Sequence, residues 1–142
     1  MIHFIIYGEP KGKGRPRFYR RGNFVGTYTP EATRIAERSV FEQSLDKKPK
    51  TPMTGAILIE IEFYMPIPKS TSKKLKARME SNAVPHIKKP DIDNLIKSIL
   101  DPLNTIYWED DSQIYSIKAG KYYGKCPMTK VWIEEIKEGS DV

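Results

Sequence analysis

Hydrophobic and polar side chains alternate along several short stretches of the chain, and this alternation predicts β-strands. The clearest stretch covers residues 56–65, where Ile57, Ile59, Ile61 and Phe63 alternate with a more polar set of side chains. Successive side chains of a strand point to opposite faces, so one face of this strand should be buried. Shorter runs predict further strands over residues 2–7, 24–28, 113–122 and 129–136, with a basic, glycine-containing loop after the first.

From Asp91 onward the apolar residues recur at helical spacing instead. This spacing predicts an amphipathic helix that leaves Asp93, Lys97 and Asp101 on another face. Pro102 should end or distort its last turn, because proline cannot donate the backbone hydrogen bond of a helix. The apolar positions are Ile92, Leu95, Ile96, Ile99, Leu100 and Leu103.

A second helix is predicted from its start signal. Thr29 and Pro30 suit the N-cap and the first position of a helix that runs to about residue 45. Its core-facing positions should be Ile35, Ala36 and Val40.

The remaining segments complete a mixed pattern. Residues 70–81 predict a short, very basic helix, residues 81–90 a loop, and about the last seven residues a tail. Strands and helices interleave without regular alternation or an internal repeat. The chain therefore predicts an α+β fold, a single compact domain over residues 1–142 in which a mixed sheet of about four to five strands packs against two or three helices.

The composition is that of a soluble protein. The chain has 142 residues, of which 39% are hydrophobic, enough for one sizeable core. No stretch approaches the roughly 20 apolar residues that a membrane helix needs, and the first residues lack the features of a signal peptide. Cys126 is the only cysteine, which excludes an internal disulfide and fits a reducing compartment. We therefore expect a cytoplasmic protein that does not bind membranes.

The formal net charge of +6 is unevenly spread. A first basic block covers residues 11–21 and a second covers residues 69–89. Lys and Arg side chains that contact phosphates release counterions, so these blocks predict binding to nucleic acid, although either block alone is also compatible with a solvated surface. The candidate DNA-binding residues are Lys11, Lys13, Arg15, Arg17, Arg20, Lys73, Lys74, Lys76, Lys88 and Lys89.

Two acidic groups interrupt this basic chain. Asp91 and Asp93 lie at the start of a predicted helix, where aspartates commonly cap free N–H groups and favour the helix dipole. That structural explanation stays open for this pair. Glu109, Asp110 and Asp111 precede a strand and have no helix start to explain them. If the two groups converge, three or four carboxylates surround one point and their repulsion requires a cation.

The chemistry of such a cluster favours a hard metal ion. Carboxylate oxygens without a His or Cys pair select Mg²⁺, or Mn²⁺ as a substitute, over zinc. A bound ion could polarise a phosphodiester and lower the pKa of an attacking water. Lys97, on the same predicted helix as Asp91 and Asp93, would stabilise negative charge that develops on the phosphate or orient the water, rather than act as a base. Glu109, Asp110 and Asp111 supply the other candidate carboxylates.

Other chemistries fit less well. His3 and His86 are far apart and form no spaced ligand pair, and no Ser-His-Asp grouping is evident. The glycine-containing loop lacks the Lys-Ser/Thr ending of a nucleotide-binding loop, which disfavours an ATPase. Four aromatic residues either stack on bases or belong to the core, namely Tyr19, Tyr28, Trp108 and Tyr122.

The segments DIDNLIK and WEDDSQI resemble, in order and spacing, the DxDNxxK and WxDDxQ signature of the RusA family of Holliday junction resolvases. PKGKGRPRF and TYTP resemble the phage-associated and Gram-positive branch of that family. The resemblance implies that Asp91, Asp93 and Asp111 are catalytic metal ligands beside Asp110, and that Lys97 is the catalytic lysine. It also implies a homodimer that binds four-way DNA junctions and makes paired symmetric nicks with Mg²⁺, in DNA recombination and repair.

Two other functions are compatible with the same residues. The first is a less selective nuclease of the same chemistry that cuts branched DNA or flaps. The second is a non-catalytic DNA-binding module of phage regulation, in which the acidic residues only cap and solvate. An acidic cluster repels phosphate unless a metal or catalysis requires it, which favours an enzyme over the module.

Overall fold

The computed structural model describes residues 1–137. Its centre is a four-stranded sheet made of β1 (Ile2–Tyr7), β4 (Ala56–Pro66), β5 (Ile114–Gly124) and β6 (Met128–Ile136), in the order β1-β6-β4-β5. Strands β4 and β5 are parallel, whereas β6 pairs antiparallel with both β1 and β4. The predicted mixed sheet and its four strands are thus confirmed. Of the predicted tail, residues 138–142 lie outside the described part of the chain.

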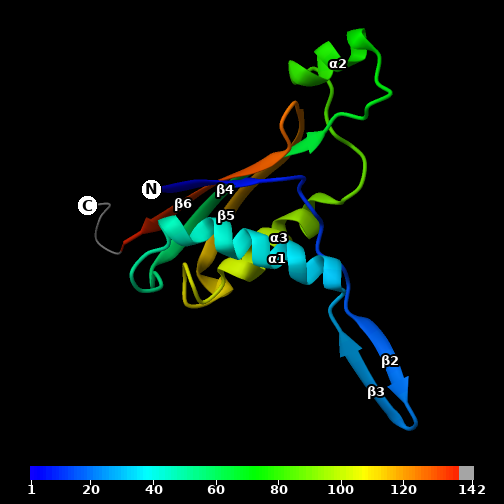
Figure 1. Cartoon of the computed structure of the whole chain (residues 1–142). Coiled ribbons are helices and arrows are strands. Elements are labelled where there is room, and N and C mark those ends of the chain that lie inside the picture. Colours follow the sequence, from blue (N-terminus) through cyan, green and yellow to red (C-terminus); the bar gives the residue numbers. More distant parts are fainter. Residues whose placement is uncertain (138–142) are drawn as a thin grey trace.

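The core lies between one face of the sheet and two helices, α1 (Glu31–Ser44) and α3 (Ile92–Leu103), which run across that face (Figure 1). The alternation in β4 produces this arrangement, because every second side chain from Ile57 to Met65 is buried against the helices. Helix α3 contributes its apolar stripe of Leu95, Ile99 and Leu103, as its periodicity predicted.

Helix α1 begins one residue later than predicted. Pro30 is its N-cap rather than its first residue, and the Pro30 carbonyl accepts hydrogen bonds from the backbone N–H groups of Thr33 and Arg34. The prediction that Ile35 faces the core is wrong, since its side chain is 63% exposed. The buried side chains of α1 are Thr33, Val40 and Ser44. Ile35 falls outside this stripe because successive residues are separated by about 100° around a helix.

Two segments project from this body in opposite directions (Figure 1). One is an arm that carries α2 (Lys73–Glu80), the predicted short basic helix, capped by the Ser72 side chain. The other is a two-stranded ribbon of β2 (Arg17–Arg21) and β3 (Phe24–Tyr28). Strand β3 was predicted, but β2 was placed in a loop, which is wrong. Neither ribbon strand has a buried face, so the sequence of β2 does not need to alternate between hydrophobic and polar residues. The local indication of a ribbon is the turn at Gly22-Asn23, where Gly22 has φ +57°.

Two short 3₁₀ turns, Leu45–Lys47 and Asp111–Gln113, complete the elements. Among the described residues, none of the helices combines the length and the apolar character required to cross a membrane.

Candidate functional site

The first turn of α3 presents two carboxylates to solvent. Asp91 is the N-cap residue of the helix, but its side chain accepts no capping hydrogen bond from the helix. Asp93 follows in the first turn and is also exposed. Capping therefore does not explain Asp91, and both carboxylates are accessible to a ligand. Lys97 lies one turn further along, exposed, and forms no ion pair within residues 1–137.

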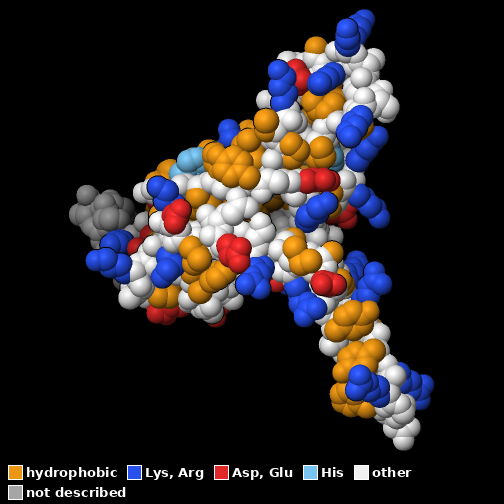
Figure 2. Space-filling view, in the orientation of Figure 1, with side chains coloured by type: hydrophobic (Ala, Val, Ile, Leu, Met, Phe, Trp, Pro, Cys, Tyr) orange, Lys and Arg blue, Asp and Glu red, His pale blue; other side chains and the backbone are white. Residues whose placement is uncertain are grey.

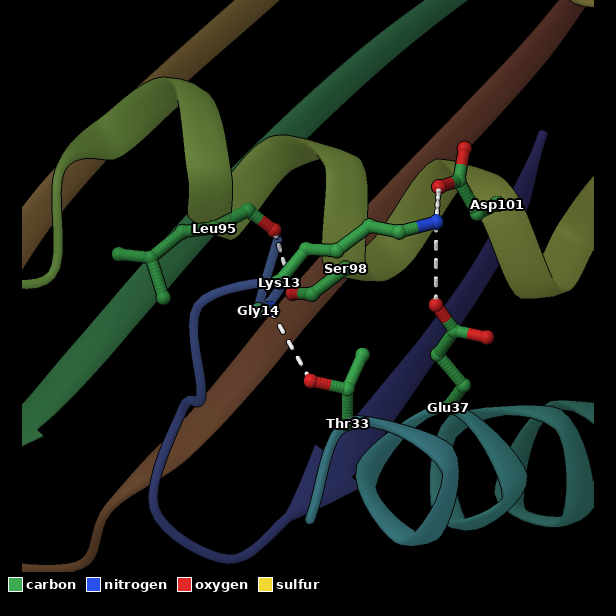
Figure 3. Close-up of polar contacts among 7 residues, drawn as sticks. All are labelled: Lys13, Gly14, Thr33, Glu37, Leu95, Ser98 and Asp101. Carbon is green, nitrogen blue, oxygen red and sulfur yellow. Dashed lines mark hydrogen bonds and ion pairs between the residues drawn. The ribbon is translucent and has the colours of Figure 1, made fainter. Parts of the chain in front are cut away.

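The loop that leads from β1 to the ribbon is tied to both α3 and α1 by polar contacts, and Figure 3 shows those of Gly14 and of the Lys13 side chain. The Lys13 backbone N–H donates to the Asn94 carbonyl at 3.2 Å, and the Gly14 N–H donates to Thr33 Oγ1 at 3.0 Å. The Lys13 ammonium donates to the Asp101 carboxylate and lies 3.3 Å from Glu37 Oε1. We call this group of Lys13, Glu37 and Asp101 the lysine latch.

The lysine latch changes the role expected of Lys13. The hydrogen bond that Lys13 donates to Asp101 raises the pKa of Lys13 above 10.5, with a smaller contribution from Glu37, and burial opposes the shift. The ammonium is therefore charged at neutral pH and already paired with two carboxylates. The sequence alone placed Lys13 among the DNA-binding residues, whereas the structure uses its charge to hold the loop.

Two adjoining open clefts lie between this loop and the start of α3. One, of about 360 Å³, is lined by Asp93, Lys97 and Asp101 on the helix side and by Arg15 on the loop side. The other, of about 680 Å³, also contains Arg15 and joins it to Asp91 and the neighbouring Lys89. The predicted acidic residues at the start of α3 thus share a groove with predicted DNA-binding cations.

The chain is also fixed just before it enters α3, by residues that the sequence did not single out. The Lys121 ammonium on β5 donates to the Lys88 carbonyl at 2.7 Å and to the Pro90 carbonyl at 3.0 Å. Further back, the buried His86 ring packs on Tyr123 with their ring centroids 4.9 Å apart. Burial is the main cause that lowers the pKa of His86. These contacts dock the α2 arm on β5.

The second acidic group is built around a buried tryptophan. Trp108 is fully buried, and its indole N–H donates to Asp111 Oδ1 at 2.7 Å. Asp110 instead caps the following 3₁₀ turn, because its Oδ1 accepts from the Ser112 N–H at 3.0 Å. Its own N–H donates to Gln113 Oε1 at 2.8 Å. Asp111 is therefore oriented from the core, whereas Asp110 has a local structural role.

The two acidic groups lie at opposite ends of α3. Lys121 contacts Pro90 immediately before Asp91, whereas Asp111 comes just before Ile114, the first residue of β5. Ile114 and Lys121 are seven residues apart on that strand, which is about 23 Å at roughly 3.3 Å per residue. Within residues 1–137, no three His, Cys, Asp or Glu side chains are grouped so that they could hold a metal ion. The condition under which the sequence predicted a metal site, convergence of the two groups, is therefore not met within one chain, since the length of α3 separates them.

The remaining predicted cations lie on the two projections and at the groove. Arg17 and Arg20 belong to the ribbon, and Lys11 pairs with Glu9 at 3.5 Å in the loop before it. The Lys and Arg side chains spread along both projections (Figure 2). The predicted DNA-binding cations of the α2 arm are Lys73, Lys74 and Lys76, with Lys88 and Lys89 at its base.

The four candidate aromatic residues separate into two classes. Trp108 is core, and Tyr122 packs beside Tyr64 with ring centroids 5.6 Å apart. Tyr19 and Tyr28 of the ribbon are 40% and 48% exposed, so they are not part of the core.

Comparisons with known proteins identify the family of the chain. The family model "Endodeoxyribonuclease RusA" matches residues 7–134, a range that includes the groove, both acidic groups and the ribbon. The chain is also 35% identical over 137 residues to "Uncharacterized protein YqaN" of Bacillus subtilis (strain 168), and the match covers 95% of this chain and 96% of that protein. The chain belongs to the RusA endodeoxyribonuclease family and is therefore a nuclease that acts on DNA junctions.

Proposed function

We propose that the protein is a Mg²⁺-dependent enzyme that resolves four-way DNA junctions by paired symmetric nicks. The observation that carries the proposal is the groove at the start of α3, where Asp91 makes no capping hydrogen bond, Asp93 is exposed, and both lie beside Lys97 and Arg15. A purely DNA-binding groove would not place accessible carboxylates where phosphates must lie, because like charges repel. Family membership likewise supports an enzyme over the non-catalytic module.

Each side chain of the groove has a distinct role in this proposal. Asp91 and Asp93 supply hard oxygen ligands, the donor set that Mg²⁺ or Mn²⁺ prefers. A divalent ion bound there would lower the pKa of an attacking water and neutralise charge on the phosphate. Lys97, whose ammonium has no partner among the described residues, stabilises the extra negative charge of the pentavalent transition state. Arg15 holds the neighbouring phosphate.

A homodimer would complete the ligand set. Within one chain Asp111 is kept at the far end of α3, yet its orientation by Trp108 is the kind of support that metal-binding carboxylates commonly have. Strand β5 forms an edge of the sheet, is 11 residues long, and exposes Tyr115 and Ile117. Antiparallel pairing of two β5 edges about a twofold axis would bring the start of one β5 to the end of the other. Asp111 of the partner subunit would then join Asp91 and Asp93.

This arrangement also explains paired nicks. A twofold dimer carries two equivalent grooves, and a four-way junction offers two equivalent scissile phosphates. The cations of the ribbon and of the α2 arm diverge from each groove, so they can contact the backbones of different junction arms.

The function is tested by cleavage of an end-labelled synthetic four-way junction and of a linear duplex of equal length, with Mg²⁺ or EDTA. The wild type should nick the junction symmetrically only with Mg²⁺, and Asp93→Asn should bind the junction without cutting it. Equal cutting of the linear duplex would replace the proposal with a less selective nuclease. Metal-independent cutting would refute the metal mechanism.

Mixing two inactive variants tests the shared site. Asp93→Asn and Asp111→Asn are each expected to be inactive alone. In a mixed dimer, however, one groove keeps Asp91 and Asp93 of one subunit and Asp111 of the other. Random re-pairing makes half of the dimers mixed with one intact groove each, so activity should return to about a quarter of the wild-type level. Failure of the mixture to cut, once mixed dimers have been detected by mass, would place each site within a single chain.

A further inference from the structure

The ribbon of β2 and β3 exposes more apolar surface than its own stability needs. All of its residues are exposed except Gly26, and it adds nothing to the hydrophobic core. Phe18 is 76% exposed, Phe24 61% and Val25 59%. A lone two-stranded ribbon is marginally stable in water, and contiguous exposed apolar side chains mark interaction surfaces. These exposed side chains therefore indicate that the ribbon binds a partner.

The register of the ribbon sorts its side chains onto two faces. Arg17 pairs with Tyr28, Tyr19 with Gly26, and Arg21 with Phe24, and paired residues share a face. On this face Tyr19 lies between two other rings, with its centroid 6.1 Å from that of Phe24 and 6.3 Å from that of Tyr28. We call Tyr19, Phe24 and Tyr28 the aromatic row. The opposite face carries Phe18, Arg20, Val25 and Thr27.

Gly26 allows the central ring of the aromatic row to lie across the neighbouring strand. A Cβ atom at position 26 would come within 2.6 Å of the Tyr19 ring, closer than real atoms approach. The ring therefore covers the Gly26 backbone. The result is a row of aromatic surfaces with Arg17 and Arg21 on the same face.

The charge of this segment identifies the chemistry of the partner. Residues 10–30 contain no acidic residue, and the acidic residues that bound this range are Glu9 and Glu31. A polyanion that also has flat aromatic surfaces fits such a ribbon, and a nucleic acid with unstacked bases has both properties. A continuous duplex hides its base faces, whereas bases at a branch point are open. The cations of residues 10–30 are Lys11, Lys13, Arg15, Arg17, Arg20 and Arg21.

The lysine latch sets the ribbon beside the catalytic groove. Residues 13 and 14 are hydrogen-bonded to α3 and α1, and β2 begins only three residues later. We propose that the aromatic row stacks on nucleobases at the branch point of the DNA junction while Arg17 and Arg21 contact adjacent phosphates. This proposal rests on the proposed function for its substrate, and it assigns recognition of the branch point to the ribbon rather than to the groove.

Binding experiments with Ca²⁺ or EDTA in place of Mg²⁺ test the aromatic row without cleavage. Tyr19→Ala removes the central ring, and Phe18→Ala is its matched control, because Phe18 is the neighbouring residue on the opposite face and is more exposed. Tyr19→Ala should weaken junction binding about tenfold, within the range measured for base stacking on aromatic side chains. Its binding to linear duplex should stay within about twofold. Phe18→Ala should change neither affinity by more than about twofold.

A second variant displaces the ring without deleting it. Gly26→Ala fills the space under Tyr19 and should reproduce the loss of junction affinity, while both variants should keep the wild-type melting temperature because the ribbon lies outside the core. Equal losses on junction and duplex, or equal effects of Phe18→Ala and Tyr19→Ala, would overturn the proposal. Cleavage by wild type is measured separately, so a failed resolvase assay with an intact Tyr19 effect would refute the proposed function alone.

Discussion

Replacing Lys13 by Met tests whether the lysine latch holds the fold or binds DNA. The substitution keeps the length of the side chain but removes the charge, and it leaves Asp101 and Glu37 facing each other without a cation. The loop of residues 8–16 would lose its main side-chain tie to α1 and α3. Because this loop carries Arg15 and leads to the ribbon, cleavage of junctions should fall together with stability.

The size of the effect follows from the exposure of the three groups. Their side chains are 28–33% exposed, between the limits for buried and surface pairs. Hydrogen bonds to charged groups contribute about 1.5–3 kcal/mol, and surface ion pairs about 0–1 kcal/mol. We therefore expect Lys13→Met to lower the free energy of unfolding by about 2 kcal/mol, which for a chain of this size lowers the melting temperature by about 6 °C.

The pH dependence of this loss has a definite sign. Asp101 raises the pKa of Lys13 in the folded protein above its value of 10.5 in the unfolded chain. The stabilisation is thus fully present below pH 10.5 and is lost as the pH rises through the higher folded value. The difference between wild type and Lys13→Met should be constant from pH 7 to 9 and should shrink only in strong alkali.

Thermal melts and the salt dependence of junction binding distinguish a structural role of Lys13 from a phosphate contact. Lys11→Met is the matched control, since Lys11 lies in the same loop but its pair with Glu9 is largely exposed, and it should cost little stability. A phosphate contact would give another pattern, in which Lys13→Met keeps the wild-type melting temperature and lowers the salt slope of binding by about one. That pattern would refute the lysine latch.

Three further results are expected. Burial lowers the pKa of His86, so docking of the α2 arm is complete above pH 6.5 and weakens as the pH falls below it. Hydrogen exchange of α2 would detect this pH dependence, and His86→Phe would abolish the pH dependence. Trp108→Phe removes the indole donor of Asp111 and should lower cleavage about tenfold or more at unchanged junction affinity; normal cleavage would contradict this role. Lys97→Met should lower kcat by about 100-fold and leave the melting temperature unchanged, as measured in single-turnover cleavage and thermal melts.

Local sequence patterns were sufficient to predict the helices and strands that contribute to the core. The alternation in β4 and the helical spacing in α3 predicted both the elements and their buried faces, because burial of one face imposes a strict period on the sequence. Ile35 shows the limit of this reasoning, since α1 supplies only a weak stripe and its rotation is set by packing against β1 and α3.

The ribbon escaped prediction for the opposite reason. Strand β2 has no buried face, so nothing in its sequence had to alternate, and the segment looks like a basic loop. The role of Lys13 was equally inaccessible, because its partners Glu37 and Asp101 are 24 and 88 residues away in the chain and meet it only after α1 and α3 have packed.

The sequence was sufficient to select the residues of the candidate site, whereas the distances between these residues depend on the tertiary structure. The acidic pattern, together with the resemblance to the RusA family, pointed to Asp91, Asp93, Lys97 and Asp111 as the chemical groups of a nuclease, and the family comparison supports the activity. Only the packed fold decided that α3 runs antiparallel to β5 and so separates Asp111 from the other two aspartates. A motif specifies which groups are present, but distances across a chain depend on the length and direction of the rigid elements between them.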